Sequence, residues 1–166
     1  MAEETRKELD AIELLLQDHR EVESLFSEFD YLEQKGQDTA GVIVTACDEL
    51  ETLDALKNDI FYPAVSEASG DEAIEALLDE AEDAHDSVLD LIEDLEQMDG
   101  DAARNAQFRL IAEQVRQQIL QEESQLFPQV KALKPLNLDT LASQMKTRRD
   151  EIVAKDEPAE TIEASA

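Results

Sequence analysis

The spacing of apolar residues, in long stretches free of glycine and proline, is the feature that most constrains this chain. Apolar residues recur every three or four positions, as they do on one face of an α-helix. Only four glycines and four prolines occur among 166 residues. All-β folds need frequent turns, so this scarcity favours long helices. We therefore expect an all-α fold, and the length corresponds to one domain.

Four long helices and a shorter fifth are predicted from this periodicity. The ranges are about Glu8 to Glu33, Asp38 or Thr39 to about Ala68, the stretch between Ser69-Gly70-Asp71 and Asp99-Gly100-Asp101, about Ala102 to Leu133, and Leu138 to about Ala154. Each long helix spans about 40 Å at 1.5 Å per residue. Short breaks make sequential neighbours antiparallel, which predicts an up-down four-helix bundle with a short C-terminal helix. We expect a single domain over residues 1–154 and a disordered, polar tail over 155–166.

A short motif is repeated near the ends of the second and fourth predicted helices. Ile60-Phe61-Tyr62-Pro63 resembles Leu126-Phe127-Pro128. Each proline removes an amide donor and bends the turn around it. The repeat fits a bundle with pseudo-twofold symmetry, and it fits two independent helix ends equally well.

The charge of the chain restricts its partners. Forty-two acidic residues against fourteen lysines and arginines give a net charge of −28 at pH 7. Such a field repels phosphate backbones and anionic membrane surfaces, and no apolar run is long enough to span a bilayer. We expect no nucleic-acid or membrane partner. The acidic surface indicates a strongly hydrated face rather than a cation-collecting one, because charge runs usually serve solubility. A protein partner or self-association stays open.

Motifs that the sequence lacks bear on the cellular compartment of the protein and on whether it is an enzyme. Cys47 is the single cysteine, so no internal disulfide can form, and no secretory leader is visible. These observations favour a cytoplasmic protein. The chain shows no glycine-rich phosphate loop, nucleophile elbow or Cys-x-x-Cys motif, and we expect no enzymatic activity.

Both histidines of the chain lie on apolar stripes. For His19 or His85 taken alone, a hydrogen-bonded core histidine is the commoner explanation. The fourth predicted helix adds Glu122 and Glu123 close to its apolar face, with Gln118 one turn earlier. Buried polar groups cost stability unless they are paired or bind something. Two histidines and a carboxylate from three helices therefore form a possible set of metal ligands.

The second predicted helix argues against a metal. At the same level it carries Leu53, which offers no ligand, and Lys57, whose ammonium repels a cation. Lys57 either extends out of the bundle or points inward. If it points inward, its charge needs a carboxylate, and Glu123 is the expected partner.

Several blocks, in order and with matching spacing, resemble the hemerythrin-like, HHE cation-binding domains. The resemblance covers about residues 9–154. The blocks are Asp10-Ala11-Ile12-Glu13-Leu14-Leu15-Leu16-Gln17-Asp18-His19-Arg20-Glu21-Val22, Cys47-Asp48-Glu49-Leu50 leading to Ile60-Phe61-Tyr62-Pro63, Glu80-Ala81-Glu82-Asp83-Ala84-His85, Glu122-Glu123-Ser124-Gln125-Leu126-Phe127-Pro128 and Leu141-Ala142-Ser143-Gln144-Met145.

The resemblance implies a bundle that holds a di-iron centre among seven ligand positions. Three of these positions carry residues able to bind metal, namely His19, His85 and Glu123. The other four are occupied by Leu53, Lys57, Ala81 and Gln118. Most of the ligands are therefore missing, and we do not expect an intact di-iron centre.

Two hypotheses follow from this degenerate site. The first is a metal-free pseudo-hemerythrin with a structural, interaction or regulatory role, in which Leu53 fills the void and Lys57 replaces part of the metal charge. The second is a single, weakly bound iron or zinc ion on His19, His85 and Glu123, with Gln118 as a further ligand.

Overall fold

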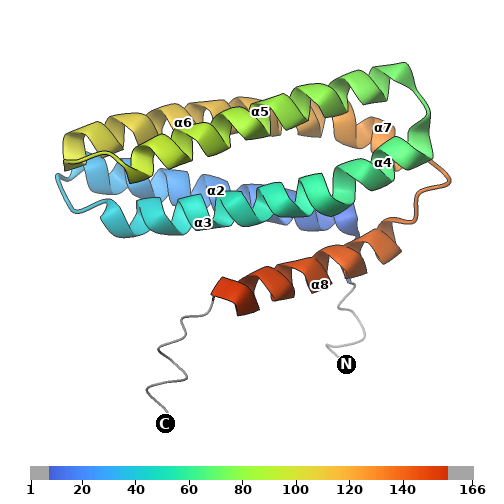
Figure 1. The fold of residues 1–166 in the computed structure, drawn as a ribbon, viewed down its shortest axis with the longest axis horizontal. Coiled ribbons are helices and arrows are strands. Elements are labelled where there is room, and N and C mark those ends of the chain that lie inside the picture. The colour runs from blue at the N-terminus through green and yellow to red at the C-terminus, as the bar shows by residue number, and fades with distance from the viewer. Residues whose placement is uncertain (1–7, 157–166) are drawn as a thin grey trace, which may run out of the picture.

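The computed structural model describes residues 8–156, which contain helices and no strand (Figure 1). In chain order the elements are α2 (Ala11–Gln34), α3 (Ala40–Leu56), the π-helical turn η1 (Lys57–Phe61), α4 (Tyr62–Ser69), α5 (Glu72–Glu96), α6 (Asp101–Gln121), the π-helical turn η2 (Glu122–Leu126), α7 (Phe127–Lys131) and α8 (Leu138–Asp156). The expected all-α class is confirmed.

The chain forms four antiparallel rods, which are α2, α3–η1–α4, α5 and α6–η2–α7 (Figure 1). Their apolar stripes meet in one core. Near the α2–α3 turn, Phe108 packs against Phe26 and Phe29, with ring centroids 5.7 and 4.7 Å away. Phe61 and Phe127 fill the core beside the π-helical turns, and their ring centroids are 5.8 Å apart. The up-down bundle expected from the short connections is what the structure shows.

The helix ends differ slightly from the predicted ones. The first helix begins at Ala11 rather than Glu8, because Asp10 and Glu13 form a reciprocal capping box. The fourth ends at Lys131 rather than Leu133. At the C-terminus α8 continues two residues past Ala154 to Asp156. The remainder of the predicted disordered tail, 157–166, lies outside the described residues.

The repeated proline motif has a structural counterpart. In each copy a π-helical turn begins six residues before the proline, at Lys57 before Pro63 and at Glu122 before Pro128. Each turn closes on a bond from the amide of the residue before proline, that of Tyr62 to the Lys57 carbonyl and that of Phe127 to the Glu122 carbonyl. π-Helical turns alter the direction of the side chains they carry and are common at functional sites.

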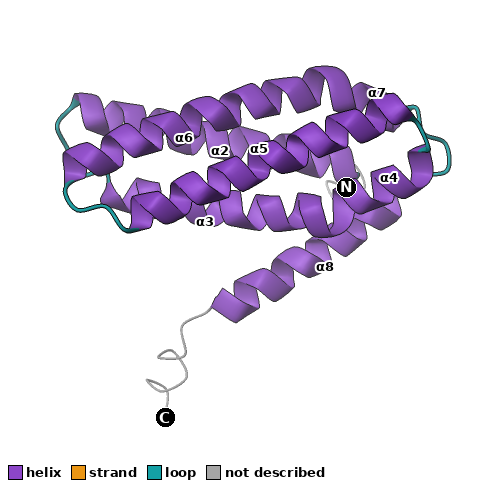
Figure 2. Ribbon diagram, turned by 45° about the horizontal axis from the view of Figure 1, so that its top comes forward, coloured by secondary structure: helices purple, strands orange, loops and turns teal. Residues whose placement is uncertain are grey.

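The last helix, α8, lies outside the bundle against α2, α3 and η1 (Figures 1 and 2). It buries Leu141, Ala142 and Met145. Further along α8, Arg149 donates to Asp18 of α2 and to Glu49 of α3, the latter over 3.3 Å. Among residues 8–156, the structure contains no helix that is both long enough and apolar enough to cross a membrane.

Candidate metal centre

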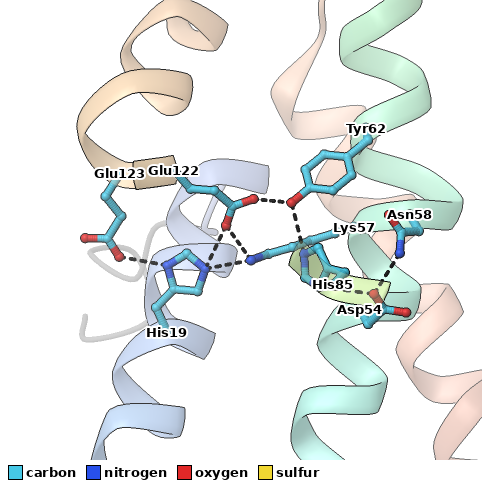
Figure 3. Close-up of polar contacts among 8 residues, drawn as sticks. All are labelled: His19, Asp54, Lys57, Asn58, Tyr62, His85, Glu122 and Glu123. Atoms are coloured by element: carbon cyan, nitrogen blue, oxygen red, sulfur yellow. Dashed lines mark hydrogen bonds and ion pairs between the residues drawn. The ribbon is translucent and has the colours of Figure 1, made fainter. Parts of the chain in front are cut away.

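The buried polar groups of the core gather at the level of the two π-helical turns. Five of these groups face one another, and each rod contributes at least one. They are His19 of α2, Lys57 of η1, Tyr62 of α4, His85 of α5 and Glu122 of η2 (Figure 3). All five are buried. Every rod of the bundle therefore places an ionisable side chain at the same level of the core.

Lys57 points inward, and the residue is 1% exposed. Its Nζ lies 2.5 Å from Glu122 Oε1 and 2.9 Å from His19 Nε2. An ammonium group only donates, so Nε2 of His19 accepts, and Nδ1 carries the proton that it donates to Glu123 Oε2 over 2.7 Å. Burial and the nearby Lys57 charge lower the pKa of His19, which agrees with a neutral ring.

The expected pairing of Lys57 with Glu123 is wrong, because the partner is Glu122. Glu122 starts η2 and faces the interior, where it is 3% exposed. The next residue, Glu123, is 38% exposed and bonds to the outer nitrogen of His19. Adjacent helical residues point about 100° apart, so only one of the two glutamates can face Lys57.

Glu122 is held by groups on both of its oxygens. Tyr62 donates its hydroxyl to Oε2, opposite Lys57 on Oε1. Burial acts to raise the pKa of Glu122, but the charge of the Lys57 ammonium and its hydrogen bond to the carboxylate outweigh it and hold that pKa well below its usual range. Burial and the Glu122 charge raise the pKa of Tyr62. The glutamate is therefore ionised and the tyrosine neutral.

The hydrogen-bond network continues beyond Tyr62 to His85 and Asp54. The Tyr62 oxygen lies 3.1 Å from His85 Nε2, and His85 Nδ1 lies 3.0 Å from Asp54 Oδ1. Asn58 donates to the same Asp54 oxygen over 2.7 Å. Polar contacts thus run without a break across the bundle, from Glu123 at one edge to Asp54 at the other (Figure 3).

The structure brings together only part of the predicted ligand set. His19 and Glu123 are bonded to each other, whereas His85 lies on the far side of the Lys57–Glu122 pair (Figure 3). Four residues of the network were not among the predicted site residues, namely Asp54, Asn58, Tyr62 and Glu122. The repeated motif carried the signal for Glu122, since it precedes Pro128 by the same six residues that separate Lys57 from Pro63.

The other family ligand positions, Leu53, Ala81 and Gln118, carry neither an imidazole nor a carboxylate. Leu53 and Ala81 are core residues, 2% and 7% exposed. Gln118 is buried, and its Nε2 has no hydrogen-bond partner among the described residues. That nitrogen is only a donor, so the amide oxygen is the one atom of Gln118 able to bind a cation, and it is uncharged.

The di-iron centre implied by the family does not fit these residues. Two iron ions inside a bundle need several carboxylates and imidazoles directed at them. Among the described residues, Glu122 is the carboxylate directed between His19 and Tyr62 at this level, and its oxygens are bonded to Lys57 and Tyr62. The lone pair of His19 Nε2 accepts from Lys57, so the ammonium occupies the ligands that a metal would use.

A second group of possible metal ligands lies near α8. Carboxylate oxygens of Asp18, Glu21 and Glu49 fall within 4.8 Å of one another. Arg149 already pairs with Asp18 and Glu49. Burial raises the pKa of Asp18 to about 6, against the lowering effect of Arg149. We interpret this group as an ion-pair cluster that attaches α8 to the bundle.

A four-helix bundle with histidine and carboxylate side chains converging at its centre belongs to the class of metal-binding helical bundles. The family model of the hemerythrin HHE cation binding domain matches residues 10–130, and the chain belongs to this family. The family resemblance found in the sequence is thereby confirmed. No curated protein and no solved structure matches the chain.

Proposed function

We propose that this protein is a metal-free, non-catalytic member of the HHE family with a structural, interaction or regulatory role. The observation that supports this proposal best is the position of Lys57 Nζ, 2.5 Å from Glu122 Oε1 and 2.9 Å from His19 Nε2 in the centre of the bundle. The ammonium takes the place of the family's cations and neutralises the buried carboxylate of Glu122.

Electrostatics opposes a metal ion at this point. Two unit charges 4 Å apart interact by about 4 kcal/mol at an effective dielectric constant of about 20, and a divalent ion doubles this repulsion. A cation on Glu122 would have to displace Lys57 or sit beside it. Displacement would leave a buried ammonium without a partner, which is strongly unfavourable.

The proposed role follows from the absence of a free ligand at the centre of the bundle, as described for residues 8–156. Without an open coordination position the centre offers nothing to bind or activate oxygen. A hydrogen-bond network in which the buried charges are paired instead fixes the four rods relative to one another. The bundle then serves as a rigid acidic scaffold whose surface, rather than its interior, carries the function.

Metal content tests the proposal directly. The full chain is produced in iron-rich medium and its iron and zinc are measured beside its ultraviolet-visible spectrum. We expect a blank spectrum, less than about 0.1 metal ion per chain, and a Tm unchanged by chelator. Near-stoichiometric iron that is lost together with helicity on chelation would overturn the proposal.

Restoring the missing ligands tests the same idea from the other direction. In the triple variant Leu53→His, Lys57→Glu, Gln118→His we expect iron to bind and to give the absorption of an oxo-bridged pair. The matched control is Leu53→His, Gln118→His with Lys57 retained, which we expect to stay free of iron. A control that binds as much iron as the triple variant would show that Lys57 does not exclude the metal.

The single-ion alternative on His19, His85 and Glu123 is tested by adding Fe(II) or Zn(II) to the wild-type chain. We expect no change in Tm, because the two histidines face opposite sides of the Lys57–Glu122 pair. A rise in Tm that both His19→Ala and His85→Ala abolish would establish the alternative instead.

A further inference from the structure

The helix α6 is unlike its neighbours in charge. Over Asp101–Gln121 it carries two acidic residues, Asp101 at its first position and Glu113, and three arginines. The adjacent α5, over Glu72–Glu96, carries eleven acidic residues and no lysine or arginine. In a chain of net charge −28, α6 is therefore a place where another acidic molecule can approach without strong repulsion.

The outward face of α6 and the start of η2 forms a stripe of six exposed residues at helical spacing. We call it the α6 stripe, and its members are Ala106, Leu110, Glu113, Gln117, Leu120 and Ser124. Five of the six are uncharged. Leu110 is 43% and Leu120 69% exposed, although both are large apolar side chains. Neither leucine is among the apolar side chains that pack against the core.

Two copies of the α6 stripe match each other when they run in opposite directions. If two copies pair with antiparallel α6 helices about a twofold axis near residue 115, Leu110 faces Leu120 of the other copy. Glu113 then faces Gln117, whose amide can donate to the carboxylate. Ala106 faces Ser124 at both ends. In this register no carboxylate of the stripe opposes another.

We propose that the α6 stripe is a self-association surface and that its occupant is the same stripe of a second copy of this chain, in antiparallel register. A closed twofold pair is the commonest form of homo-oligomer, and it requires a self-complementary patch of this kind. Pairing through any acidic face would set carboxylates against carboxylates. The inference goes beyond the proposed metal-free function and does not depend on it, because none of the six residues belongs to the buried network.

Sedimentation equilibrium on the full chain tests self-association. The experiment is run in about 0.5 M salt, where the long-range repulsion between two acidic chains is screened. We expect a concentration-dependent dimer for the wild type and at least a tenfold weaker dimer for Leu120→Glu. The matched control is Val44→Glu on α3, where a valine 60% exposed lies outside the stripe and the dimer should persist. Circular dichroism verifies that the variants fold.

Three results would overturn the proposal. One is a wild-type chain that stays monomeric up to about 1 mM, because no stripe contact would then be populated. Another is a dimer that Leu120→Glu leaves intact. The third is a dimer that Val44→Glu weakens as much as Leu120→Glu, since the contact would then not be specific to the stripe.

The register is tested by the double variant Leu110→Glu, Leu120→Lys. In the antiparallel pair each new glutamate faces a new lysine, so the dimer should reform more strongly than with Leu110→Glu alone. In a parallel pair like charges would meet. A double variant less associated than the single variant would therefore overturn the antiparallel arrangement, and with it the proposal.

Discussion

Lys57 and Glu122 form a buried ion pair, with Nζ 2.5 Å from Oε1, and each is the first residue of a π-helical turn. Both stand six residues before a proline, so the pair joins equivalent positions of the two halves of the bundle. An acidic residue at both positions would bring two like charges together, which a metal ion would have to bridge. With a lysine at one of them the site neutralises itself.

Removing the ammonium should destabilise the bundle strongly. Lys57→Met leaves Glu122 buried without its counter-charge, and we expect a loss of about 3–5 kcal/mol in the free energy of unfolding. Urea denaturation followed by circular dichroism measures it. The control Lys131→Met, at an exposed lysine of α7, should change stability by no more than about 0.5 kcal/mol. A loss at Lys57 as small as at Lys131 would contradict a buried, paired lysine.

Replacing both members of the pair should be less harmful than replacing one. In the double variant Lys57→Met, Glu122→Leu no charge is left unpaired, and apolar replacement of a buried ion pair is often neutral. We expect the double variant to be more stable than Lys57→Met alone. If the two losses simply add, the residues do not act as a pair.

The buried Tyr62 hydroxyl should be needed for stability because it contacts both Glu122 and His85. Tyr62→Phe removes the donor to Glu122 Oε2 and a contact of His85 Nε2, leaving buried polar atoms unsatisfied. We expect a loss of about 1–3 kcal/mol. Tyr31→Phe, at a tyrosine 59% exposed, is the matched control and should have little effect in the same denaturation experiment. Equal effects would refute the role of the buried hydroxyl.

Two neighbouring arginines of α8 should differ in importance. Arg149 pairs with the buried Asp18, whereas Arg148 pairs with the exposed Asp59. We expect Arg149→Met to cost roughly 1–3 kcal/mol, because Asp18 loses its charged partner, and to speed proteolysis at α8. Arg148→Met should cost less than about 1 kcal/mol, as is usual for surface ion pairs. The reverse order would show that α8 is held by other contacts.

Cys47 should be almost unreactive in the folded protein. Burial, reinforced by Glu51, Glu96 and Asp48, raises the pKa of the thiol to about 12. At pH 9 the thiolate is abundant in the unfolded chain but scarce in the native one, so reaction with a thiol reagent should be at least about a hundredfold slower before denaturation.

The same pKa shift fixes the sign of an alkaline stability effect. Only the unfolded chain loses the thiol proton between the usual pKa and about 12, so this group's contribution to stability falls as the pH rises through that range. The Cys47→Ala variant should lack this part of the decline. A native thiol that reacts as fast as the denatured one would contradict the burial.

Much of the fold could be predicted from the sequence because helices are local structures. Apolar periodicity located the rods, and the glycine-containing breaks located the turns within a few residues. The start at Ala11 was missed by three residues, since it depends on the Asp10–Glu13 capping box rather than on periodicity.

The sequence by itself determined that this is an acidic helical bundle of the HHE family, and it predicted that most of the family's ligand positions carry other residues. Only the tertiary structure decided what stands in their place. Apolar periodicity cannot predict which of the adjacent Glu122 and Glu123 points inward. The reason is that a π-helical turn rotates the following side chains away from the directions that regular α-helical spacing gives them. The inward choice of Glu122, and with it the ion pair to Lys57, is set by contacts between rods far apart in the sequence.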